Sequence, residues 1–350
     1  MKSNIKKDLK KLLRFLRRWN KFFIGIIAFR LLKILCVVAK PNIILTYSNN
    51  KKPDGVGAQV QRLLALRSLC QSLGLGYKHT KIASVAIHPL DSYQTLEEMK
   101  EFVAELNHEF FMLDSKYNES LETLEIDIPK LNFTEMFFLV LRSTFTKKQI
   151  VIQCVEPYSI AECDPHIYSE ILSFLPNFVP LKREFGTLGI HYRRGVGGLS
   201  VQIGEKLSRE IGSEYFVSIA RKIINDPIAS SLKLLIFTDS PSADIVFKPP
   251  ASQLDLWKTS QRFVDGEMQV VGMDLGKIFQ DVISNVEVVY GGNPLHVIKS
   301  LASMEYLVLS RSSFGYVAAI LNTEGKIYFP SGFWHIPKIG WKVIEEVNDD

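Results

Sequence analysis

The second half of the chain alternates short apolar segments with segments of helical periodicity, and this alternation constrains the fold most. The expected strands are 187–190, 232–237, 286–290, 306–309 and 326–329. The expected helices are 213–224, capped by Ser213, then 295–304 and 315–321. Parallel strands need crossover connections of this kind, and helices on both faces bury such strands. The pattern therefore predicts an α/β domain built on a mostly parallel sheet.

The first half opens with the same logic. Its first expected elements are a strand over 43–47, a glycine turn over 54–59, a helix to about Leu73 and a strand over 77–82. Later we expect a helix over 95–111, a strand over 150–154 and a helix over 164–174. The first group forms a βαβ unit. A proline-containing stretch, 176–185, suggests a domain boundary, which predicts domains 42–180 and 181–350.

Residues 1–41 form a separate, basic arm. They hold 12 of the 42 Lys and Arg residues and one acid, Asp8, so the rest of the chain is net acidic. Apolar and basic positions alternate with helical spacing over 5–23, and an apolar stretch with Arg30 and Lys33 follows. We expect an amphipathic helix on the anionic, cytoplasmic face of a membrane, and a single-pass anchor remains the alternative. The four cysteines lack zinc-ligand spacing and favour a reducing compartment.

Three polar clusters follow expected strands of the second domain. They are His191 with Arg193 and Arg194, Thr238-Asp239-Ser240, and Ser310-Arg311-Ser312-Ser313. Carboxyl ends of parallel strands share one sheet edge, where ligands bind. Arginine forks match phosphate oxygens, a carboxylate can accept from a ribose hydroxyl or a base, and a helix opening at the serines favours anions. The clusters predict a nucleoside-diphosphate pocket, although each alone is also compatible with solvated arginines or ordinary helix caps.

These residues resemble the motifs of a known enzyme family. His191-Tyr192-Arg193-Arg194-Gly195 resembles the HxRRxD motif shared by α-1,2-, α-1,6- and protein O-fucosyltransferases. The stretch 235–240 resembles their second motif, and 303–319 with Ser312-Ser313-Phe314 resembles their third. Gly55-Val56-Gly57-Ala58-Gln59 is similar to the "GGLGNQ" turn that opens these enzymes, and 326–330 with Trp334 is similar to the ending of the α-1,2 group.

The resemblance implies a GT-B-like fold, in which two Rossmann-like domains face a central cleft, the first for the acceptor and the second for the nucleotide sugar. It implies transfer of fucose from GDP-fucose to a glycan hydroxyl, with inversion and without a metal or cofactor, in cell-surface glycan synthesis. Arg194, with Arg193 beside it, would stabilise the departing phosphate. His191 and Asp239 would contact the nucleoside, and Ser312 and Ser313 the pyrophosphate. Gly55, Gly57 and Gln59 would shape the turn on the acceptor side.

The chain departs from the family pattern at several positions. Val196-Gly197-Gly198 stands where the motif has Asp, Ala58 replaces Asn, and Gly315-Tyr316-Val317 replaces Ser-Trp-Trp. A catalytically inactive nucleotide-sugar-binding protein or a membrane scaffold therefore stays open as an alternative. The base that takes the acceptor proton is also open among Asp54, His79 and Glu156, with Asp54 as our first choice.

Overall fold

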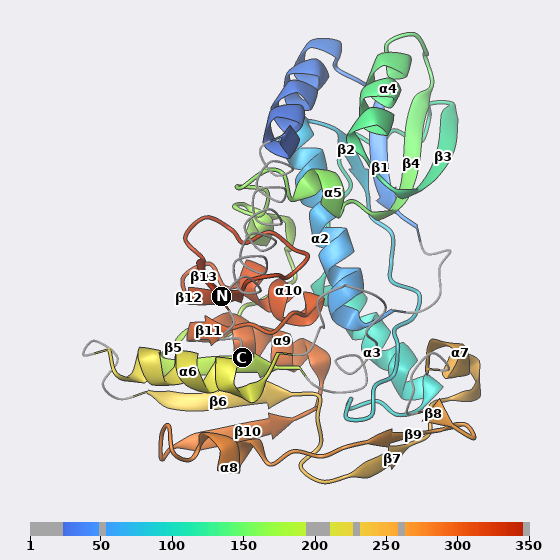
Figure 1. Ribbon diagram of the computed structural model, residues 1–350. Coiled ribbons are helices and arrows are strands. Elements are labelled where there is room, and N and C mark those ends of the chain that lie inside the picture. Colours follow the sequence, from blue (N-terminus) through green and yellow to red (C-terminus); the bar gives the residue numbers. More distant parts are fainter. Residues whose placement is uncertain (1–23, 49–53, 194–210, 227–231, 258–262, 346–350) are drawn as a thin grey trace, which may run out of the picture. The chain divides into compact units, whose positions relative to one another are not determined.

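The computed structural model describes residues 24–48, 54–193, 211–226, 232–257 and 263–345 (Figure 1). The chain divides into two compact units. The first comprises Met1–Asn49, Arg62–Thr80 and Met112–Glu170, and the second comprises Asn50–Gln61, Lys81–Phe111 and Ile171–Asp350. Helix α2 (Val56–Leu73) contributes its first residues to the second unit and the remainder to the first.

The first unit is built on a four-stranded sheet of order β2-β1-β4-β3 in which every neighbouring pair is parallel. The strands are β1 (Ile43–Tyr47), β2 (Gly76–Lys78), β3 (Thr123–Lys130) and β4 (Gln149–Glu156). All five side chains of β1 are buried, as expected of an apolar run in the middle of a parallel sheet. Helix α4 (Phe133–Ser143) provides the crossover from β3 to β4 (Figure 1).

The second unit contains a six-stranded parallel sheet of order β10-β6-β5-β11-β12-β13. The strands are β5 (Glu184–Tyr192), β6 (Lys233–Thr238), β10 (Val286–Tyr290), β11 (Met304–Val308), β12 (Lys326–Pro330) and β13 (Lys342–Ile344). The predicted α/β class with two Rossmann-like units is confirmed by these two parallel sheets, and β10 has the bounds expected from the sequence.

Alternation along β5 sends neighbouring side chains to opposite faces of this sheet. Ile190 and Tyr192 pack in a core with helix α6 (Ser213–Ile224) and helix α8 (Leu275–Phe279). His191, between them, stacks on Phe314 of helix α10 (Ser313–Leu321), with ring centroids 5.4 Å apart. The period-two geometry of the strand therefore places one polar side chain on the α10 face while its neighbours anchor the opposite core.

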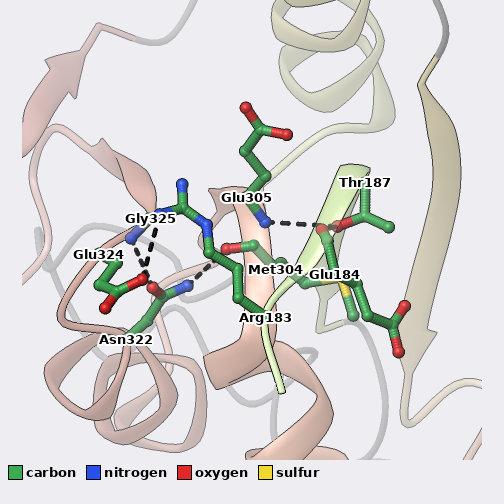
Figure 2. A network of polar contacts seen from close by, with 8 residues as sticks. All are labelled: Arg183, Glu184, Thr187, Met304, Glu305, Asn322, Glu324 and Gly325. Atoms are coloured by element: carbon green, nitrogen blue, oxygen red, sulfur yellow. Dashed lines mark hydrogen bonds and ion pairs between the residues drawn. The ribbon is translucent and has the colours of Figure 1, made fainter. Parts of the chain in front are cut away.

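Polar contacts fix the amino-terminal ends of β5 and β11 (Figure 2). Asn322, the residue after α10, donates to the Met304 carbonyl at 2.8 Å and accepts from the Gly325 N–H at 2.7 Å. The Glu305 N–H donates to the Thr187 hydroxyl at 3.3 Å. These contacts join the start of β11 to β5 and to the turn before β12, so they hold the register on which the opposite edge depends.

Segment 81–111 belongs to the second unit through specific contacts. It contains helix α3 (Leu96–Glu109), which begins with a capping box of Thr95 and Glu98. Lys299 of helix α9 (Pro294–Ser303) pairs with Glu109 at 2.8 Å, and the Ile87 N–H donates to the Gln253 side chain at 2.9 Å. No local sequence pattern predicts these long-range contacts.

Two local expectations were wrong. The stretch 164–174 forms turns and a short 3-10 helix, η1 (Ile171–Phe174), because its backbone N–H groups bond three residues back, as from Ile167 to Asp164. Ser213 is the first residue of α6, and Gly212 occupies the cap position without a side-chain bond. The sequence also missed β3, α4 and a small antiparallel sheet of β7 (Ile245–Phe247), β9 (Glu267–Val270) and β8 (Phe263–Val264).

Residues 24–39 form a helix in the first unit, which buries Phe29, Leu32 and Cys36. The rest of the expected amphipathic segment, 1–23, lies outside the described residues. Within the described ranges, no helix combines the length and hydropathy needed to cross a membrane. All four cysteines are buried and unpaired with one another.

Candidate functional site

Three adjacent strands bring the predicted polar clusters to one edge of the six-stranded sheet. The sheet order places β5 between β6 and β11. Tyr192 is in register with Thr238, so Arg193 and Asp239 follow the last paired residues of neighbouring strands. Ser310 and Ser312 follow β11 in the same way. The prediction that these residues share one edge is confirmed, because parallel register fixes where each strand ends.

His191 is buried, with 7% of its surface exposed. Its Nδ1 lies 2.8 Å from the Ser310 hydroxyl. Burial lowers the pKa of His191 to about 4, against the opposing effect of Asp239. The imidazole is therefore neutral near pH 7. The ring leaves no room for a side chain at position 315, since a Cβ on Gly315 would lie 2.7 Å from Nδ1. This contact accounts for glycine at position 315.

Arg193 joins the other two clusters. Its Nη1 donates to the Ser312 hydroxyl at 2.8 Å, and its Nε lies 3.8 Å from the Asp239 carboxylate. Both charged side chains are mostly buried, with 20% and 30% exposed. A guanidinium held at a helix start can meet an incoming phosphate with little reorganisation. Arg194, the arginine that we favoured as the phosphate ligand, lies outside the described residues.

The start of α10 is the third part of the site. Ser312 is its N-cap and accepts from the Phe314 N–H at 3.3 Å. The Ser313 hydroxyl contacts Nε2 of His335 at 3.3 Å, and Trp334 donates to the same nitrogen at 2.8 Å. Trp334 remains 49% exposed. The helix start thus combines a positive dipole end with two hydroxyl groups and a nearby indole.

Most of the stretch 54–59, expected as a glycine turn, is the first turn of helix α2, and it packs against the start of α10. A Cβ on Gly57 would lie 2.3 Å from the Phe314 Cα, so only glycine permits the approach. Gln59 is buried, and its amide nitrogen donates to the carbonyls of Asp54 and Ser84 at 2.9 and 2.7 Å. Gly55 donates its N–H to the Asp54 carboxylate at 2.8 Å. These contacts hold the start of α2 in place beside the start of α10.

The other two base candidates, His79 and Glu156, belong to the first unit. The N–H of His79 donates to the Asp114 carboxylate at 2.6 Å, and its ring contacts the Tyr77 hydroxyl at 3.1 Å. Asp54 belongs to the second unit, together with His191, Arg193, Asp239, Ser312 and Ser313.

Sequence reasoning missed His88 and Asp91. Both lie in the loop before α3, and both interact electrostatically with Arg193 and Asp239. The loop has no recognisable motif, and only its tertiary position connects it to the site. Across the described ranges, no group of three His, Cys, Asp or Glu side chains is arranged to hold a metal ion.

Comparisons with known proteins give similarity of structure only. No protein-family model and no curated protein matches the sequence. Among solved structures, E. coli heptosyltransferase WaaC with ADP is 12% identical, with 87% of this chain and 93% of that chain covered and a TM-score of 0.34. POFUT1 in complex with GDP is 7% identical, with 82% and 97% covered and a TM-score of 0.41. A glycosyl transferase family 9 protein from Veillonella parvula is 10% identical, with 87% and 85% covered and a TM-score of 0.33.

Proposed function

We propose that the protein is a glycosyltransferase that moves a sugar, with fucose from GDP-fucose as the first candidate, onto a glycan hydroxyl. One observation carries the proposal. The Arg193 guanidinium lies between the Ser312 hydroxyl at the start of α10 and the Asp239 carboxylate at the end of β6. This arrangement suits a nucleoside diphosphate, because arginine and the helix start can hold phosphate while a nearby carboxylate can accept from ribose or base.

The chemistry needs stabilisation of a leaving group. The acceptor oxygen attacks the anomeric carbon, the bond from that carbon to the β-phosphate oxygen breaks, and the nucleoside diphosphate leaves with the electron pair. Negative charge grows on the phosphate, so preorganised donors at its position lower the barrier. Arg193 and the N–H groups at the start of α10 would supply such donors. Ser312 and Asp239 hold the guanidinium before the donor arrives.

A donor panel tests this function. Calorimetry with GDP, UDP and ADP should show micromolar binding of GDP and at least tenfold weaker binding of the others. Labelled fucose should then pass from GDP-fucose to a glycan acceptor, and GDP-mannose serves as a matched donor with the same nucleotide. Binding of GDP without transfer to any acceptor would favour an inactive binding protein. A protein that binds no nucleotide would contradict the proposal and favour a scaffold.

We further propose that helix 24–39 rests on an anionic lipid surface. Its outward face carries large apolar side chains at helical spacing, each more than half exposed: Ile24, Ile27, Leu31, Ile34 and Val38. Arg30 and Lys33 are exposed on the same helix, and residues 24–40 contain no acid. An apolar stripe with flanking cations matches the interface of an anionic bilayer. The basic segment 1–23, which precedes the helix, adds to this charge.

Vesicle flotation tests the lipid surface. The protein should bind phosphatidylcholine vesicles that contain phosphatidylglycerol and should bind pure phosphatidylcholine vesicles more weakly. The double variant Ile27→Glu/Leu31→Glu should lose most of this binding. Val246→Glu/Val264→Glu, at exposed positions of the second unit, is the matched control and should retain it. Equal binding by both double variants would contradict the proposal. If the protein is a dimer that dissociates only in Ile27→Glu/Leu31→Glu, the apolar face contacts a second copy of the chain and not lipid.

A further inference from the structure

The loop that carries His88 and Asp91 is attached to the sheet edge by backbone hydrogen bonds. The Gly292 N–H donates to the Leu90 carbonyl at 2.8 Å, and the Ser92 N–H donates to the Gly292 carbonyl at 3.0 Å. The Gly291 N–H in turn donates to the Thr238 carbonyl at 2.9 Å, one residue before Asp239. A series of backbone hydrogen bonds therefore connects the loop to the sheet edge where Arg193 lies.

Glycine is required where the loop meets the sheet. Gly291 has a φ of 65°, and a Cβ there would lie 2.1 Å from the Leu90 carbonyl oxygen. The Asp91 carboxylate is held on one side, since its Oδ2 accepts from the His88 N–H at 2.8 Å. The residue as a whole is half-buried. Asp91 thus has a fixed orientation and keeps some access to solvent.

The protein environment shifts the pKa values of Asp91 and His88, and these shifts set the charge of both groups near neutral pH. Burial is the main cause that raises the pKa of Asp91 to about 7, and the charge of Asp239 acts in the same direction. The His88 N–H, the Tyr93 hydroxyl and Arg193 oppose this rise. Burial, with Arg193, lowers the pKa of His88 to about 4. Near pH 7 the imidazole is neutral and the carboxyl is close to half ionised. A pKa near the working pH is what a general base requires.

We propose that Asp91 is the general base that takes the proton from the acceptor hydroxyl. This inference rests on the proposed glycosyl transfer. The hydroxyl attacks the anomeric carbon on the side opposite the phosphate oxygen that Arg193 would hold, so its base must lie near the Arg193 site without binding the phosphate itself. The backbone bonds on both sides of Asp91, from Leu90 and Ser92 to Gly292, place it at this edge. Its carboxyl interacts with both Arg193 and Asp239. In the reaction the hydroxyl oxygen forms the bond to the anomeric carbon, the proton moves to the Asp91 carboxylate, and the nucleoside diphosphate leaves.

The charged and titratable groups around Asp91 come from four elements. His88 and Tyr93 flank it on its own loop, Arg193 follows β5, and Asp239 follows β6. Asp54, in the turn before α2, acts electrostatically on His88 and is the competing base. Among these groups, Asp91 has its pKa raised to about 7 by burial, whereas the pKa values of His88 and His191 fall to about 4.

Rate measurements with Asp91→Asn and Asp54→Asn decide between the two carboxylates. For the full-length protein, kcat/KM should fall below a midpoint near pH 7. Asp91→Asn should lower kcat about 100-fold or more and remove this acidic limb, since general bases contribute that much. Its affinity for GDP should stay within threefold of the wild-type value. Asp127→Asn, at an exposed position of β3 in the first unit, is the matched control and should behave as wild type.

Each contrary outcome has a distinct meaning. An Asp91→Asn variant with kcat within threefold of wild type and an unchanged acidic limb overturns the role of Asp91. If Asp54→Asn alone removes the limb, Asp54 is the base. If Asp91→Asn does not fold, a wild-type profile without an acidic limb near pH 7 overturns the proposal by itself. A wild-type protein that binds GDP and transfers nothing refutes the transferase, whereas an active one without this limb refutes only the base.

Discussion

The two edges of the six-stranded sheet both carry polar networks, and they differ in what the polar groups do. At the amino edge, the Thr187 hydroxyl of β5 accepts from the backbone of β11, and Asn322 joins the start of β11 to the turn before β12 (Figure 2). At the carboxyl edge, Arg193 and Asp239 form an ion pair in partly buried positions, and burial keeps His191 neutral. Hydrogen bonds to backbone groups stabilise the fold, whereas partly buried charged side chains can bind a ligand.

The largest expected effect is on the rate of transfer, and it distinguishes the arginine at the carboxyl edge from the arginine at the amino edge. Arg193→Ala should lower transfer from GDP-fucose at least 100-fold, because it removes a preorganised cation from the leaving group. Arg183→Ala at the amino edge removes a surface pair with Glu324, and it should leave the rate within twofold. Steady-state kinetics on the two variants checks this difference. Similar losses in both would mean that the carboxyl edge has no special role.

A stability measurement should show the opposite pattern. Asn322→Ala leaves the Gly325 N–H and the Met304 carbonyl without their side-chain partner in a buried place. We expect a loss of about 2 kcal/mol in the free energy of unfolding, measured by urea denaturation. GDP affinity should stay within twofold of wild type. Glu324→Ala, in the same network but exposed, serves as the control and should cost less than about 1 kcal/mol.

Gly315→Ala tests how tightly the carboxyl edge is packed. The added methyl group would lie 2.7 Å from the buried His191 ring, so the ring or α10 must shift. Overpacking of this kind costs about 1–3 kcal/mol, partly offset by the better helix propensity of alanine. Thermal unfolding and GDP calorimetry should both show a loss. Gly212→Ala, where a Cβ would meet no atom within 4 Å, is the control; equal behaviour of the two variants would contradict the packing argument.

The smallest effect concerns the cost of keeping Asp91 ionised. Its folded-state pKa of about 7 lies above the ordinary value of 3.8, so protonation favours the folded state between these values. Its contribution to stability is therefore full below about pH 4 and is lost as the pH rises through 7. Asp91→Asn should raise the Tm at pH 8 by about 2–4 °C and give no gain at pH 4. A lower Tm at pH 8 would show that the carboxylate stabilises the fold.

The regular parts of the fold were predictable from local pattern. The apolar runs at β5, β6 and β10 and the serines that open α10 follow from side-chain chemistry and spacing. The strand β3 was not predictable in this way, because its side chains are exposed or only partly buried and its apolar pattern is weak. The turns over 164–174 were also missed, since buried side chains such as Ile167 and Tyr168 imitate a helical face.

Side-chain chemistry and spacing along the chain are enough to place His191, Arg193, Asp239 and Ser312 at one edge, because each stands at or just after the end of an apolar strand and parallel strands end together. The folded structure is needed to show which of them touch, why positions 57 and 315 must be glycine, and that His88 and Asp91 join them. The periodicity of helices and strands depends on residues that are close in the sequence. The attachment of a loop to a distant sheet edge depends on long-range backbone bonds and close packing, which leave no repeating pattern along the chain.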